Sequence, residues 1–166
     1  MIKVALKYGI VNGAFLIILF LVGLSLGIHP FLEIRHLFFD FTLFGLFIFF
    51  TLNEFKRYRN DGILHFWQGM SLGFYVIVIA IALYVIFIGT YIDPDFIAEY
   101  QKLAHELLAA KVDQFPDDFN ESQLAAHQQA IDQLTEWRLI SQTAVKKIVT
   151  GFFVTPVISI FLRRNK

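Results

Sequence analysis

The sequence predicts an all-α, polytopic membrane protein with four transmembrane helices and an extramembrane helical hairpin between the third and fourth. The first observation is a set of four long apolar runs, because a helix needs ~20 mostly apolar residues to cross the ~30 Å hydrocarbon core. The second is composition: 57% of the 166 residues are hydrophobic and 17% are charged, whereas soluble domains have ~45–50% and ~25%. The third is an acidic stretch, residues 93–138, with ten acidic and three basic residues.

The four spans are expected at residues 8–28, 34–53, 63–92 and 139–162, within a single membrane domain that covers residues 1–166. The first span has no charge and ends at His29-Pro30. It is longer than the ~7–15-residue apolar core of a signal peptide, so we expect it to be retained. The fourth span contains Pro156, which membrane helices tolerate.

Residues 93–138 are predicted to form an acidic helical hairpin. Asp93-Pro94 is typical of an N-cap followed by proline in the first turn. A helical apolar face follows, formed by Phe96, Tyr100, Leu103 and Leu107. Pro116-Asp117-Asp118 should end this helix, and Asn120 or Ser122 can cap a second one. The second helix would bury Leu124, Ile131 and Leu134. The two halves are expected to continue spans three and four; the alternative is a polar loop.

The distribution of charge predicts the orientation in the membrane, because Lys and Arg concentrate on the cytoplasmic side. With the N-terminus inside, the inner segments carry eight cations and two acids, a net +6, and the outer segments carry six cations and twelve acids, a net −6. Both termini are therefore expected in the cytoplasm, and the hairpin in the periplasm or outside the cell. The inner cluster Lys56-Arg57-Tyr58-Arg59 either determines this topology or contacts anionic lipid.

Small residues at helical spacing predict close helix–helix contacts, because spans associate in lipid through small side chains. These contacts either close this bundle, the interpretation we favour, or recruit another chain. The residues concerned are Gly9, Gly13, Gly23 and Gly27 in the first span, Gly69 and Gly73 in the third, and Gly151, Thr155 and Ser159 in the fourth.

Two charged residues lie inside predicted spans. Asp40 is about one turn inside the second span, and Lys147 lies at a similar depth in the fourth. Charges in hydrocarbon usually pair or line a cavity. We therefore consider an intramembrane Asp40–Lys147 ion pair, with independent extension of each side chain to the headgroups as the alternative. Asn12 and Gln68 are expected to form interhelical hydrogen bonds.

Four polar side chains precede or begin the second span at spacing i, i+4, i+7 and i+11: His29, Glu33, His36 and Asp40. Glu-x-x-His also occurs in di-iron bundles, but those sites need a second copy on another helix, which the sequence lacks. These four are therefore weak metal or proton-relay candidates, and we expect no metal or cofactor. Catalytic motifs such as G-x-S-x-G, H-E-x-x-H and phosphate-binding glycine loops are absent.

The chain resembles the DUF4199 family, small bacterial inner-membrane proteins that are classed as a domain of unknown function. The matching segments are Leu6-Lys7-Tyr8-Gly9, Tyr58-Arg59-x-x-Gly62, Phe66, the Gly69 and Gly73 pair, Asp93-Pro94-Asp95-Phe96 and Phe161-Leu162-Arg163-Arg164. The chain departs from the family at Phe115-Pro116-Asp117-Asp118, where a glycine-containing turn is common. The resemblance implies four spans with an outward helical insert in a bacterial inner membrane, and it implies no activity.

These features predict a non-enzymatic accessory or scaffold subunit of a cell-envelope complex. It would dock onto another membrane or envelope protein through its glycine-rich helix faces and its acidic hairpin, and a homo-oligomer is a further option. A nucleic-acid partner is excluded because the chain has no basic surface. The alternatives are a small transporter or ion-conducting bundle that uses the outer polar cluster, and a lipid-modifying enzyme with its site there.

Overall fold

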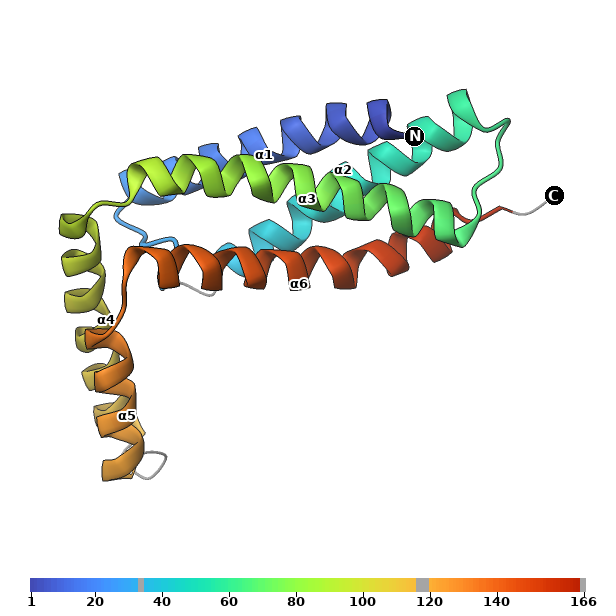
Figure 1. Cartoon of the computed structure of the whole chain (residues 1–166). Helices are drawn as coiled ribbons and strands as arrows, with labels where there is room; N and C mark the ends of the chain where they lie inside the picture. Colours follow the sequence, from blue (N-terminus) through green and yellow to red (C-terminus); the bar gives the residue numbers. More distant parts are fainter. Residues whose placement is uncertain (33–34, 116–119, 165–166) are drawn as a thin grey trace. The chain divides into compact units, whose positions relative to one another are not determined.

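The computed structural model describes residues 1–32, 35–115 and 120–164, and within these ranges the chain is helical with no strand (Figure 1). The all-α prediction is confirmed. Four of the helices are long and apolar enough to cross a membrane. The helices are α1 (Ile2–Ser25), α2 (Arg35–Arg59), α3 (Phe66–Tyr91), α4 (Pro94–Gln114), α5 (Glu121–Asp132) and α6 (Glu136–Leu162).

The first span differs from its predicted bounds at both ends: α1 begins at Ile2 and ends at Ser25, before residue 28. Its end is a Schellman motif, in which the Ile28 N–H donates to the carbonyl of Gly23 at 2.9 Å. Gly27 occupies the left-handed position with φ +70°, and a Cβ added there would meet nothing within 4 Å. Gly27 therefore terminates α1, and its predicted role in helix packing is wrong.

The chain divides into two compact units, a bundle unit (Met1–Phe87 and Thr143–Lys166) and a hairpin unit (Ile88–Gln142). In the bundle unit, α1 and α2 run antiparallel to each other, and so do α3 and α6. Lys7 near the start of α1 contacts Glu54 near the end of α2. Leu64, just before α3, pairs with Arg164, just after α6, through two backbone hydrogen bonds. One end of the bundle therefore holds the start of α1, the end of α2, the start of α3 and the end of α6.

Apart from Gly27, the predicted packing glycines lie at contacts between helices of this chain. On α1, a Cβ added at Gly9 would lie 2.8 Å from the Cβ of Ile79, and one at Gly13 would lie 3.0 Å from the Ala80 carbonyl oxygen, both in α3. Gly23 abuts the His36 ring of α2. These three glycines are thus packed against helices of this chain, which is the interpretation that the sequence favours over contact with another chain.

A second set of small residues forms the contact between α3 and α6, which we call the α3–α6 seam. A Cβ on Gly69 would lie 2.6 Å from Ser159 Oγ, one on Gly151 would lie 2.7 Å from Ile77 Cγ1, and one on Gly73 would overlap Thr155. Residue numbers fall along α3 as they rise along α6, so the helices are antiparallel. Small side chains here let the two backbones approach closely.

The outer surface of the bundle unit is apolar. Phe38, Ile86 and Phe153 are 71%, 67% and 66% exposed, respectively. Soluble monomers rarely expose large contiguous apolar patches, so this surface is suited to the hydrocarbon of a bilayer. The interior is also largely apolar, with fully buried side chains that include Leu16, Phe20, Phe44, Ile48, Leu52, Leu72 and Ile77.

In the hairpin unit, side chains cap the starts of α4 and α5, and polar contacts join the two helices. Asp93 caps α4 by accepting from the Phe96 N–H at 2.8 Å, and Asn120 with Gln123 forms a capping box at the start of α5. Gln101 of α4 donates to the Ile131 and Asp132 carbonyls at 3.1 and 3.2 Å. His105 also lies 2.8 Å from the Asp132 carboxylate.

Two details of the hairpin prediction are wrong. The hairpin helices do not continue the spans, because the Asp93 cap starts α4 anew and residues 133–135 separate α5 from α6. On α4 the buried residues are Ile97 and Ala104, whereas Leu107 is 46% exposed. The expected turn at Pro116-Asp117-Asp118 lies outside the described residues.

The glycine contacts predict that a glycine-to-alanine substitution changes the free energy of unfolding differently at two positions. Gly9→Ala should lower the free energy of unfolding by ~1–3 kcal/mol, because the new methyl group collides with a branched side chain. Gly45→Ala is the matched control, since its Cβ would meet only Val154 Cγ1, at 3.9 Å. It should be neutral or should stabilise by up to ~1 kcal/mol. Equilibrium unfolding in mixed micelles tests both, and equal effects would contradict the close approach of α1 to α3.

Candidate functional site

A buried ion pair joins α2 to α6 in the bundle unit. Lys147 Nζ donates to both carboxylate oxygens of Asp40, each at 2.6 Å, and the two side chains are each 9% exposed. The ammonium also lies 4.6 Å from the centroid of the Tyr84 ring in α3, within the range of a cation–π contact. One lysine therefore links three helices.

The spacing of small residues on α6 explains the position of this lysine. Lys147 lies one helical turn before Gly151, which packs on Ile77 of α3. Its side chain therefore starts on the face of α6 that meets α3, where Tyr84 lies one to two turns beyond Ile77. Because α2 borders the same end of this face, the lysine stem brings the ammonium to Asp40.

The pair is electrostatically self-contained. Both Asp40 oxygens accept from Lys147, so a cation that approached the carboxylate would have to displace the ammonium. In a low-dielectric interior, loss of one partner leaves an uncompensated charge, which typically costs 3–5 kcal/mol. The geometry therefore makes the pair a brace between helices, in which both carboxylate oxygens of Asp40 are bonded to Lys147.

The four weak metal candidates are not gathered into a site in the part of the chain that the structure describes. His36 abuts Gly23, the His29 ring centroid lies 5.9 Å from that of Phe31, and Asp40 is bound by Lys147. Glu33 lies outside the described residues. Among the residues that are described, no three His, Asp or Glu side chains are close enough to hold a metal ion together.

Gln68 and Asn12 do not form the interhelical hydrogen bonds that the sequence predicts, as far as the described residues show. Gln68 Oε1 accepts from the His65 N–H at 3.1 Å and from Asn60 Nδ2 at 3.2 Å, so it organises the turn before α3. Asn12 is fully buried in α1, and neither atom of its amide has a hydrogen-bond partner among the described residues.

The end of the bundle that holds both termini is rich in cations, and two of them connect helices. Lys7 Nζ and the Tyr8 hydroxyl both donate to Glu54 at 2.7 Å, which ties α1 to α2. Lys56 Nζ donates to the Leu162 carbonyl at 3.0 Å, which ties α2 to α6. The sequence pattern did not predict these bonds, because their partners are far apart in the chain.

The surface of the hairpin unit is the second candidate site. None of the twelve residues of α5 is buried. Most of the acidic side chains of the stretch are exposed on α4 and α5. Tyr100 of α4 is half-buried, and desolvation raises the pKa of its phenol. The hairpin thus presents an acidic exterior that is largely free of helix–helix contacts.

Together, the four span-length helices, the apolar outer surface and the buried ion pair define an integral membrane protein with a helical bundle. A family model described as "Protein of unknown function (DUF4199)" matches residues 7–164, so the chain belongs to this family. This confirms the family resemblance. No curated protein and no solved structure gives a significant match.

The ion pair predicts strong energetic coupling between its members. Asp40→Asn and Lys147→Gln should each destabilise the bundle by ~3–5 kcal/mol, because each leaves the other charge buried and unpaired. The double variant should cost much less than the sum of the two. Unfolding free energies in mixed micelles give this double-mutant cycle, with Thr42→Val on the exposed side of α2 as a control of little effect. Additive losses would show that the two charges are independent.

Proposed function

We propose that this protein is a non-enzymatic accessory or scaffold subunit of a bacterial cell-envelope complex. The bundle anchors it in the inner membrane, and the acidic hairpin formed by α4 and α5 binds a partner protein. The termini lie in the cytoplasm and the hairpin lies in the periplasm or outside the cell. The partition of charge along the chain supports this orientation, with a net +6 on one set of segments and −6 on the other.

The observation that carries the proposal is the absence of burial in α5. Most helical stability in proteins comes from tertiary packing, and isolated helices shorter than ~12–15 residues are marginal in water. This helix has 12 residues; Leu124 and Ile131 are partly covered, and none is fully buried. Its ends are well capped, by Asn120 with Gln123 at the start and by contacts from Gln101 at the end. A partner surface would supply the burial that α5 lacks.

The chemistry of the hairpin indicates what the partner offers. The stretch 93–138 has ten acidic and three basic residues, which favours a partner with a basic surface, since complementary potentials steer association. The exposed side of α5 also carries small apolar side chains, including Ala126 and Ala130. A helix with such a face fits a shallow groove on a folded partner.

Copurification tests this proposal. Tagged full-length protein, extracted from its native membrane in mild detergent, should carry a stoichiometric partner. Ala126→Arg with Ala130→Arg should remove that partner, because the new side chains add bulk and positive charge to the contact face. Ala126→Ser with Ala130→Ser is the matched control: it changes the same two exposed positions without adding bulk or charge, and it should keep the partner. A single monodisperse species without any partner would contradict the proposal.

The buried ion pair favours one alternative, a small transporter or ion-conducting bundle, since ionisable groups within spans often mark ion pathways. Purified protein in proteoliposomes separates the two functions. Cation or proton flux that Asp40→Asn abolishes, while the variant stays folded, would support transport. A scaffold subunit should produce no flux above that of empty liposomes.

A further inference from the structure

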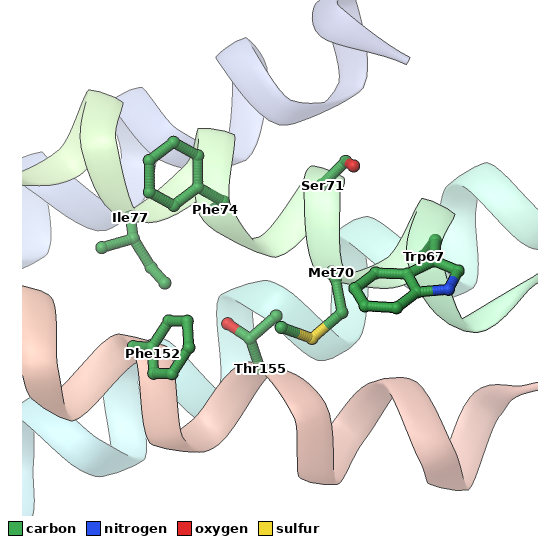
Figure 2. A pocket seen from close by; sticks show the side chains of 7 residues that line it. All are labelled: Trp67, Met70, Ser71, Phe74, Ile77, Phe152 and Thr155. Carbon is green, nitrogen blue, oxygen red and sulfur yellow. The ribbon is translucent and has the colours of Figure 1, made fainter.

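An open apolar groove lies beside the α3–α6 seam. It encloses about 270 Å³ and is lined mainly by Trp67, Met70 and Phe74 of α3 and by Phe152 and Thr155 of α6 (Figure 2). The close approach at the small residues of the seam forms its floor, and the larger side chains on either side form its walls. The Thr155 hydroxyl donates to the Gly151 carbonyl at 2.8 Å. The threonine therefore presents little unsatisfied polarity to the groove.

The dimensions of the groove match one lipid chain. It extends along α3 from Trp67 to Ile77, a rise of about 15 Å at ~1.5 Å per residue. That is about half of the ~30 Å hydrocarbon core, the depth of a single leaflet. The groove is narrow and follows the seam, so its length suits a slender apolar chain that lies along α3.

The groove begins at the cationic end of the bundle. Leu64, three residues before Trp67, forms two backbone hydrogen bonds with Arg164, at 3.1 and 3.0 Å. Arg164 therefore lies close to the start of α3, and it is exposed. Among the described residues at this end, the acid Glu54 is already bonded by Lys7 and Tyr8. Trp67 itself is 75% exposed, as expected for a tryptophan at the membrane–water interface.

We propose that the groove binds one acyl chain of an anionic phospholipid, with the lipid phosphate against Arg164. Apolar walls of one-leaflet depth select the chain, and the arginine selects the headgroup charge. Arginine suits this role because its guanidinium forms bidentate hydrogen bonds with phosphate. The site is independent of the hairpin and would exist whether or not the hairpin has a partner.

Tryptophan quenching reports directly on the groove. The chain has two tryptophans, so Trp137→Phe leaves Trp67 as the single fluorophore. This variant is reconstituted in phosphatidylcholine vesicles that contain a small, equal fraction of either phosphatidylglycerol or phosphatidylcholine with brominated acyl chains. Brominated phosphatidylglycerol should quench Trp67 several-fold more efficiently than brominated phosphatidylcholine, because it concentrates in the groove.

Two substitutions and one control separate the parts of the site. Arg164→Gln should lower the relative affinity for phosphatidylglycerol about fivefold, which corresponds to the ~1 kcal/mol that a cation gains near an anionic lipid surface. Ser71→Phe, on the exposed lining of the groove, should reduce quenching by both lipids by filling the space. Lys3→Gln removes an exposed cation from α1 at the same end, and it should leave the preference unchanged.

Several results would overturn the proposal. Equal quenching by the two lipids would show that the groove does not select the headgroup. If Arg164→Gln and Lys3→Gln lowered the preference for phosphatidylglycerol equally, that preference would come from the overall positive charge of this end of the bundle. If Ser71→Phe changed the oligomeric state in gel filtration and not the quenching, the groove would be a contact between copies of the chain. Circular dichroism and unfolding midpoints verify that each variant is folded.

Discussion

The close approach of α3 and α6 is the constraint on which the rest of the bundle depends. On α6, Ser159 and Thr155 face Gly69 and Gly73 of α3, and Gly151 packs on Ile77. These contacts fix the antiparallel register of the two helices. That register places Lys147 against Tyr84 and Asp40, so the buried charge is compensated where it lies. It also aligns the chain end with the start of α3, where Arg164 pairs with Leu64. One seam thus determines both the ionic brace and the position of the groove.

Much of this arrangement could be predicted from sequence because it depends on local patterns. A run of apolar residues specifies a span without knowledge of its neighbours, and the stripe from Gly151 to Ser159 marks a contact face from spacing alone. Asp40 and Lys147 could be suggested as partners from their depth. Their contact with Tyr84 could not, because a tyrosine within an apolar run gives no sign of which helix it meets. Gly27 was misassigned because a helix-terminating glycine and a packing glycine share the same spacing.

The two units differ in how far their side chains are used in contacts within the chain, and this difference underlies the proposed function. In the bundle unit, the glycine faces, the ion pair and the Glu54 cluster are all used by contacts within the chain. In the hairpin unit, α5 is capped at both ends yet buries none of its residues. The caps are local and could be anticipated from Asn120 and Gln123, whereas the lack of burial is a tertiary property. A surface that is ordered but not packed is a natural contact for another protein.

The most direct test of this account is disulfide cross-linking at the end of the α3–α6 seam. The chain has no cysteine of its own, so Leu64→Cys with Arg164→Cys creates a single possible pair. Residues that exchange both backbone hydrogen bonds have Cα atoms ~5.5 Å apart, within the range that a disulfide spans. Mild oxidation in native membranes should produce an intramolecular link, seen as a reducible change in migration at the mass of one chain. A cross-linked dimer, or no link at all, would contradict a bundle that closes on itself through α3 and α6.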